Sequence, residues 1–349
     1  IYGANASGKS NLVCAMRFFQ RIIVESLNNV DDGAESILEK YSMPFSFEDK
    51  MENSEFEIVE IKDNEEYQYG FEYNSESIVM EWLYRKNLDT NRKVTIFERT
   101  TQEVNLGASV RKECEVYKDQ IPSETLVLSF FNKLKLKTDV FKKVYTSIVN
   151  ILVLSSDACE NTGVLNAVLP QIIDNEKEEL LEFLAAIDTG IKNISYDENE
   201  KEIIFYTFHK GADGEMYPLN LYNESEGTIK SIMLFIYAKT AIYKDGMIVI
   251  DELNVKLHPL LLKFIIDLFY NNDSKAQLIY TTHDTILMDK KFFRRDQIWF
   301  VQKDDLGHSE LCALSDFKVR SDASFEKDYL SGVYGGIPFL KDFSLKAGE

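Results

Sequence analysis

Apolar residues recur at two spacings that divide the chain into regions of different expected structure. Near the N-terminus, apolar residues stand three to four positions apart, which is the spacing of a buried helix face. They are Leu12, Met16, Phe19, Ile22 and Ile23. In the second half, a long apolar run typical of a buried helix spans 229–242, and shorter runs typical of core strands span 247–250, 276–282 and 297–301. We therefore expect an α/β fold built on buried strands.

The region after the first helix has a strand-like pattern. Short apolar runs, each bounded by Asn, Asp or Ser, span 45–71, 78–84 and 93–97. Such runs are typical of strands joined by tight turns. They predict an antiparallel β-rich lobe over 41–122.

Helical spacing returns after this lobe, through apolar sets such as Val127, Phe130, Phe131, Leu134 and Leu180, Phe183, Leu184, Ile187. It predicts an inserted helical lobe over 123–189. Apolar runs at 191–196 and 202–208 then indicate a hairpin that returns the chain to the main domain, which we expect to comprise 1–40 and 190–349. No a/d pattern persists for four heptads, and this excludes a long coiled coil.

Length, composition and charge indicate a globular protein and exclude several other classes. The 349 residues are 45% hydrophobic and 28% charged, which is typical of a globular chain of one large or two ordinary domains. The formal net charge of −19 excludes a field over the whole molecule that would attract nucleic acid or an anionic membrane. No apolar run approaches the ~20 residues that a membrane-spanning helix needs. The cysteines are widely spaced and fit neither a zinc site nor a disulfide framework. We expect a cytoplasmic protein without a membrane partner.

Local contact with DNA is still compatible with this charge. Two clusters of basic residues could make it: Lys133, Lys135, Lys137, Lys142 and Lys143 in the middle of the chain, and Lys290, Lys291, Arg294 and Arg295 near its end. A solvated face is the simpler interpretation of both clusters, and DNA contact is the alternative.

The first residues match the phosphate-binding pattern GxxxxGKS/T along Gly3, Ala4, Asn5, Ala6, Ser7, Gly8, Lys9 and Ser10. Such a loop binds phosphate because its backbone N–H groups form a concave anion site at a helix N-terminus. Gly3 and Gly8 permit the turns, and Lys9 would reach the β- and γ-phosphates of ATP. The Ser10 hydroxyl would ligate Mg²⁺, and Asn11 leads into the helix. By itself the pattern could also be an ordinary glycine-rich turn.

A phosphate loop normally follows a buried strand, yet only Ile1 and Tyr2 precede this one. We therefore expect that the numbered chain lacks one or more natural N-terminal strands, together with the group that contacts adenine.

Three further motifs supply the partners that the loop needs. The apolar strand 247–250 ends in Asp251 and Glu252, the form of a Walker B segment, in which Asp251 would hold the Mg²⁺ shell and Glu252 would polarise the attacking water. A second core strand ends at His283, which could hydrogen-bond the γ-phosphate. Ser225 and Gly227 precede the long helix and form another candidate anion site.

Each of these motifs also has a purely structural interpretation, but their order is specific. The phosphate loop, SxG helix, hhhhDE strand (h, hydrophobic) and strand-His segment follow one another as in an ABC-type ATPase head. The segments GANASGKSNL, ESEGT, VIDELNVKLHP, AQLIYTTHDT, RRDQIWFVQKD, ELCALSDFKVR and YLSGVYGGIP resemble the bacterial AAA-type ATPases of abortive-infection and related anti-phage operons. These are relatives of the RecF/SMC/overcoming-lysogenization-defect heads.

The resemblance runs from residue 1 to about 340 and implies a P-loop ATPase that uses ATP and Mg²⁺. It implies heads that dimerise face to face, with Ser225 and Gly227 of one chain closing on the ATP held by Lys9 of its partner. It further implies a separately encoded effector, often a nuclease. No nuclease site is expected in this chain itself, because the part after His283 is too short for the fused Toprim domain of some relatives.

Departures from the family pattern leave two alternatives open. Asn254 and Lys256 stand where the family usually has Asp and Ser or Gly, so that a carboxylate is replaced and a cation gained after the Walker B strand. Gln20 lies inside the first helix and is interpreted as structural rather than as the Mg²⁺-sensing glutamine. The alternatives are a RecF/SMC-like DNA repair ATPase and a nucleotide-gated scaffold with little hydrolysis.

Overall fold

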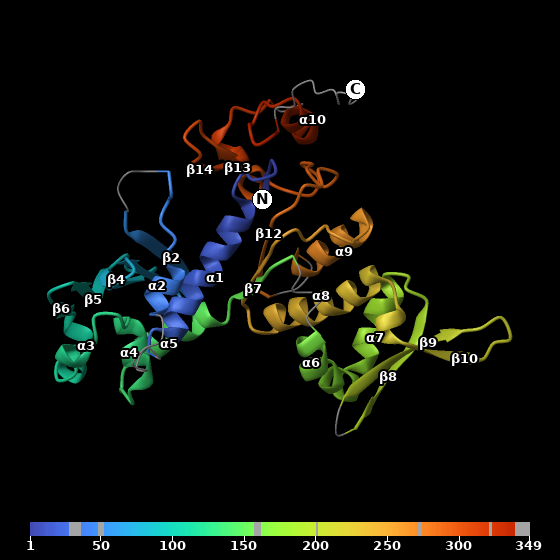
Figure 1. Cartoon of the computed structure of the whole chain (residues 1–349), viewed down its shortest axis with the longest axis horizontal. Helices are drawn as coiled ribbons and strands as arrows, with labels where there is room; N and C mark the ends of the chain where they lie inside the picture. Colours follow the sequence, from blue (N-terminus) through green and yellow to red (C-terminus); the bar gives the residue numbers. More distant parts are fainter. Residues whose placement is uncertain are drawn as a thin grey trace, which may run out of the picture. The chain divides into compact units, whose positions relative to one another are not determined.

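The computed structural model of the chain describes residues 1–27, 36–47, 52–156, 162–199, 202–270, 274–320 and 323–338 (Figure 1). It divides into two compact units. The first, here called the head unit, comprises Ile1–Val13 and Leu152–Glu349, and the second, the middle unit, comprises Cys14–Ile151. Each unit is described by itself.

The head unit is built on a mostly parallel sheet. Strands β7 (Leu152–Leu154), β11 (Met247–Ile250) and β12 (Gln277–Tyr280) pair in parallel in the order β12-β11-β7. Strand β1 (Tyr2–Gly3) pairs in parallel with β13 (Trp299–Lys303), and β14 (Ser309–Ala313) is antiparallel to β13. Hydrogen bonds from the Ile1 nitrogen to Tyr280 O (2.7 Å) and from Thr282 N to Ile1 O (3.0 Å) bring β1 beside β12. The strands β11, β12 and β1 therefore end at one common edge.

Helices cover this sheet. Helix α8 (Glu226–Tyr243) contacts α6 (Thr162–Asn175), α7 (Lys177–Ala186), α9 (Pro259–Tyr270) and β11. Its almost continuous apolar run explains this position, because a helix that is hydrophobic all round must be buried. A second, aromatic cluster packs Tyr2, Phe300 and Tyr334 against α10 (Phe325–Leu330). This cluster fixes the strand that precedes the phosphate loop.

A small antiparallel sheet completes the head unit. It contains β8 (Ile191–Glu198), β9 (Ile203–Lys210) and β10 (Met216–Asn220) in the order β10-β9-β8. The predicted hairpin is confirmed, and β10 is a third strand that the sequence pattern did not indicate. Short 3₁₀ turns connect the larger elements of the head unit. They lie at Leu221–Asn223, Arg295–Gln297 and Leu314–Asp316.

The middle unit contains the predicted antiparallel sheet. Its strands run in chain order as β2 (Ser54–Lys62), β3 (Glu65–Tyr73), β4 (Ile78–Asn87), β5 (Lys93–Thr100) and β6 (Val104–Leu106). Helix α1 (Lys9–Glu25) begins in the head unit and continues here, where Phe19, Ile22 and Ile23 join a core rich in Phe and Tyr. Short helices complete the unit: α2 (Ile37–Tyr41), α3 (Ala108–Cys114), α4 (Val127–Lys133) and α5 (Val140–Val149), with a 3₁₀ turn at Lys118–Gln120.

The units follow other boundaries than those expected from the sequence. The predicted segment 45–71 contains parts of two strands, β2 and β3, which are joined by Asp63 and Asn64 in the left-handed region; residues 48–51 lie outside the described part. The helices expected as one lobe over 123–189 divide between the units, α4 and α5 in the middle unit and α6 and α7 in the head unit. The reason is β7, a three-residue strand of the head sheet that lies between them.

None of the helices in the described ranges is long and apolar enough to cross a membrane.

A buried ion pair holds the loop before α4 against the sheet of the middle unit. Glu81 is 1% exposed, and its carboxylate accepts hydrogen bonds from Tyr69 Oη (3.0 Å) and the backbone N–H groups of Val127 (2.6 Å) and Leu128 (3.0 Å). The Arg99 guanidinium lies 4.0 Å from Glu81 and donates to backbone carbonyls of residues 122, 123 and 125. Burial raises the pKa of Glu81 to about 7, against the opposing effect of Arg99.

This arrangement predicts a pH-dependent stability. The folded pKa of about 7 lies above the ordinary value of 4.5, so the contribution of Glu81 is present below pH 4.5 and is lost as the pH rises through 7. The free energy of unfolding of the parent should fall relative to that of Glu81→Gln between pH 5 and pH 8. At ~1.4 kcal/mol per pKa unit, this change in the difference is at most a few kcal/mol. Urea unfolding at the two pH values measures it. A constant difference between the two proteins would contradict the burial effect.

Candidate functional site

The predicted phosphate loop connects β1 to α1 and depends on both of its glycines. Gly8 has a φ of +113°, and a Cβ there would lie 2.4 Å from Ser309 Oγ. At Gly3 a Cβ would lie 2.5 Å from Ser7 Oγ and 2.6 Å from Val301 O. A hydrogen bond from Ser309 Oγ to Ser7 O (2.8 Å) holds the loop on β14. Substitution at either glycine would therefore displace the loop or the strands beneath it.

Lys9 and Ser7 carry the polar groups inside the loop. Lys9 is 6% exposed, and its Nζ donates to Gly3 O and Ala4 O, both at 2.9 Å. Burial lowers the pKa of Lys9, and the charges of Glu252 and Asp251 oppose this effect. Ser7 Oγ is buried without a hydrogen-bond partner in the described part of the chain. A buried hydroxyl and an ammonium group at a helix N-terminus fit the oxygens of a phosphate chain.

The other predicted loop residues are accessible. Asn5, Ala6, Ser10 and Asn11 are exposed, and Ala6 has a φ of +60°, in the left-handed region. The Ser10 hydroxyl at the start of α1 is thus open to a ligand.

The two acidic residues of the Walker B segment bond to one threonine, Asp251 through its carboxylate and Glu252 through its backbone N–H. Asp251 is 8% exposed and its Oδ1 accepts a hydrogen bond from Thr281 Oγ1 at 2.5 Å. The backbone N–H of Glu252 donates to the same hydroxyl oxygen at 2.8 Å. Glu252 has a φ of +50°, so the chain turns sharply where β11 ends. Sequence reasoning assigned no role to Thr281, although its place directly after a core strand and two residues before His283 was a usable signal.

His283 follows β12 at the same edge of the sheet. Its side chain is exposed, yet partial desolvation and the Lys9 charge lower its pKa, while Glu252 and Asp251 act in the opposite direction. This lowering of the pKa favours the neutral imidazole of His283. Hydrogen bonds of Ile1 with Tyr280 and Thr282, and of Thr281 with Asp251, place the strand ends that precede Lys9, Asp251, Glu252 and His283 at one edge of the head sheet.

The candidate anion site at Ser225 and Gly227 is separate from this group. Ser225 caps α8 by accepting a hydrogen bond from Thr228 N at 3.1 Å, and it is exposed. A Cβ at Gly227 would lie 2.9 Å from Lys256 O, so glycine is required by a close backbone approach. In the part of the chain that the structure describes, no hydrogen bond or ion pair joins 225–227 to 3–10.

The side chains at this edge could hold Mg²⁺ only together with the phosphate oxygens of a bound nucleotide. No group of three His, Cys, Asp or Glu side chains that could hold a metal ion occurs among the described residues. Mg²⁺ is, however, usually bound by one or two protein oxygens plus phosphate oxygens and water. The sequence predicts this role for Ser10, which is exposed, and for Asp251, which is 8% exposed. Gln20 is not available for this role, because its Nε2 donates to Ile148 O and Ile151 O, each at 2.7 Å, in agreement with the structural interpretation.

Comparison with known proteins identifies the family. Residues 1–289 match the family described as "AAA domain, putative AbiEii toxin, Type IV TA system". The chain belongs to this family. The expected α/β P-loop ATPase fold and the expected relationship to abortive-infection ATPases are thereby confirmed, and membership implies that this AAA domain uses a nucleotide.

Among solved structures, this AAA domain is similar to the SMC head domain from Thermotoga maritima, with 12% sequence identity and a TM-score of 0.32. That similarity covers 73% of this chain and 75% of the SMC head. No curated protein matches the sequence.

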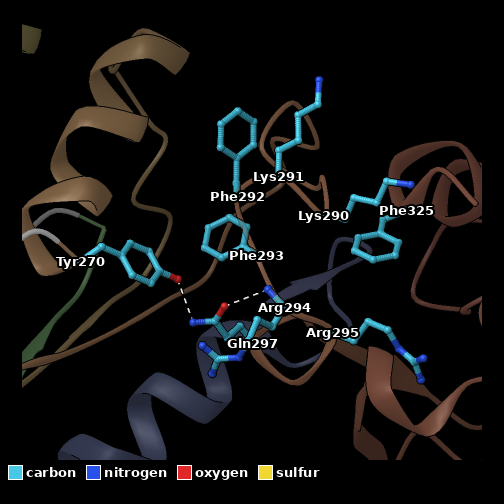
Figure 2. Close-up of a pocket in the computed structure, with 9 residues that line it drawn as sticks. All are labelled: Tyr270, Lys290, Lys291, Phe292, Phe293, Arg294, Arg295, Gln297 and Phe325. Carbon is cyan, nitrogen blue, oxygen red and sulfur yellow. Dashed lines mark hydrogen bonds between the residues drawn. The ribbon is translucent and has the colours of Figure 1, made fainter. Parts of the chain in front are cut away.

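The C-terminal basic cluster lines a recess of about 410 Å³ (Figure 2). Two of its cations already have partners within the head unit. The Arg294 guanidinium pairs with Asp296 at 2.9 Å, and Arg295 donates to Ser315 O and Phe317 O, both at 3.0 Å. Gln297 accepts a hydrogen bond from Arg294 N at 2.9 Å, and its Nε2 donates to Tyr270 Oη at 2.8 Å (Figure 2). These contacts give both arginines a structural role, and contact with DNA stays a prediction.

The shared threonine generates a testable prediction. Thr281→Val keeps the shape of the side chain but removes the donor to Asp251 and leaves the Glu252 N–H without its acceptor. We expect kcat for ATP to fall about 10-fold, because both hydrogen bonds that orient Asp251 and Glu252 are lost, with ATP affinity changed less than about 3-fold because the loop 3–10 is untouched. Phosphate release and binding of a fluorescent ATP analogue measure the two effects. Thr281→Ser, which retains the hydroxyl, is the control; equal loss in both variants would show that the hydroxyl is not what matters.

Proposed function

We propose that this AAA domain is the ATP-hydrolysing, ABC-type ATPase subunit of a bacterial anti-phage defence system, and that ATP-dependent dimerisation of two heads controls a separate effector, a nuclease. The observation that carries the proposal is that β1, β11 and β12, which precede Lys9, Asp251 with Glu252, and His283 respectively, end at one edge of the head sheet. The family description, which names a toxin of a type IV system, supports a role beside a partner protein.

The side chains at this edge suit ATP hydrolysis. The loop 3–10 would bind the phosphates, and Ser10 with Asp251 would hold Mg²⁺, which neutralises charge on the phosphate oxygens. Glu252 would accept the proton of the attacking water, so that the bond between the β–γ bridging oxygen and the γ-phosphorus breaks to give ADP and inorganic phosphate. Neutral His283 would donate a hydrogen bond to the γ-phosphate.

The exposed Ser225–Gly227 segment supports a site completed by a second chain. Ser225 caps its own helix and is exposed, and the segment makes no bond to the phosphate loop of the same chain in the described ranges. In a two-fold dimer the same surface would be used twice, so each loop would meet the segment of the partner subunit.

Glu252→Gln and Lys9→Ala separate turnover from binding. Glu252→Gln keeps the size of the side chain but cannot accept a proton, and we expect ATP turnover to fall by ~10²–10⁴ with ATP binding retained. Lys9→Ala is expected to weaken ATP binding itself. Phosphate release, nucleotide affinity and phage survival in cells that carry the complete operon are measured for both. Turnover within a few-fold of the parent would exclude Glu252 as the base, and protection from phage by both variants would contradict the defence role.

Mixing two inactive chains tests the shared site. Ser225→Arg blocks closure by its bulk but has an intact loop, and Lys9→Ala has an intact Ser225–Gly227 segment. If the site forms between chains, each heterodimer contains one unmutated site, and an equimolar mixture should recover up to about a quarter of the parent activity. Each variant alone should be inactive, and differently tagged chains verify that heterodimers form. No recovery in verified heterodimers would contradict a site shared between two chains.

A further inference from the structure

The segment that follows Glu252, here called loop 252–257, has a defined backbone. Its turns are made by Glu252 and Lys256, with φ values of +50° and +63°. Leu253 N donates to Thr281 O at 3.2 Å, and Val255 N donates to Glu252 O at 3.1 Å. One side of the loop is thus attached to the end of β12.

The other side of the loop is attached to α8. Lys230 is only 4% exposed, and its Nζ donates to Val255 O at 2.6 Å. Burial of an ammonium group is costly unless hydrogen bonds replace water, so this contact is a strong constraint on the loop. Two weaker contacts lie beside it: the close approach of Gly227 to Lys256 O, and the 3.5 Å ion pair between Lys256 and the largely exposed Glu226 side chain.

We propose that Lys230 is a positioning residue that couples Glu252 to the Ser225–Gly227 segment. Lys230 lies three residues from Gly227 on α8, slightly less than one turn, and Val255 lies three residues from Glu252. Contact of a partner's ATP with the start of α8 is therefore transmitted through Lys230 to loop 252–257 and sets the position of the Glu252 carboxylate. This inference rests on the proposed ATPase function and adds a regulatory connection within it.

Three variants isolate the Lys230 contact. Lys230→Met keeps an unbranched apolar side chain but has no donor, and Lys230→Arg keeps donors and charge. Lys239→Met is the matched control on the same helix, where Lys239 pairs with Glu176 and Glu179 instead of with the loop. All three are made in the full chain, and hydrogen exchange is measured without nucleotide.

We expect the amides of loop 252–257 to exchange about 10-fold faster in Lys230→Met, with parent-like rates in Lys239→Met and most of the protection restored in Lys230→Arg. Unchanged exchange in Lys230→Met would overturn the proposal. Faster exchange spread evenly over α8 and the loop would also overturn it, because this would be general destabilisation of the helix.

Coupling is measured with ATP. In a Glu252→Gln background, ATP should slow exchange of loop 252–257, and the addition of Lys230→Met should remove this protection. Equal protection in both proteins would overturn the coupling. With Glu252 present, kcat of Lys230→Met should fall about 10-fold with KM for ATP within about 2-fold, and Lys230→Arg should recover activity. If the parent itself does not hydrolyse ATP, the proposed function fails, while the exchange experiments still decide whether Lys230 holds the loop.

Discussion

The parallel alignment of β1, β11 and β12 is the constraint on which the candidate site depends. Because neighbouring parallel strands end at the same edge of a sheet, the residues that follow them lie close together there. The phosphate loop follows β1, the two carboxylates follow β11, and His283 follows β12. The aromatic cluster around Phe300 and the buried helix α8 are needed to keep this edge in place.

The threonine after β12, Thr281, fixes the local geometry of the two acidic residues that follow β11. Thr281 uses its single hydroxyl in both senses, as donor to Asp251 and as acceptor from Glu252 N. Asp251 is thereby held by its carboxylate at the buried edge of the sheet. Glu252 is held by its backbone N–H, on a turn with positive φ. Lys230 and Thr281 hold the same loop from opposite sides, by a carbonyl contact and a hydroxyl contact respectively.

Motifs with local causes were predictable from the sequence, and features with distant causes were not. The phosphate loop depends on glycines and a lysine within eight residues, and the apolar run before Asp251 is a recognisable strand. Strand β7 has only three residues, and its pairing with β11 joins positions nearly 100 residues apart, so no local pattern reveals it. The burial of Lys230 was equally hidden, because a lysine in an apolar helix is usually at its solvent face. The proposed relation of Ser225 to Lys9 involves a second chain, and no pattern within one chain specifies it.

The contact of Gly8 and Ser7 with Ser309 bears on how the molecule is made. The loop is among the first parts of this sequence to be synthesised, but the strand that supports it is translated some 300 residues later. Until β13 and β14 have emerged from the ribosome, β1 has no parallel partner at one side and Gly8 packs against nothing. Nucleotide affinity should therefore arise late in synthesis and in a single step. A chain released early would carry a complete phosphate-binding motif without the ability to use it.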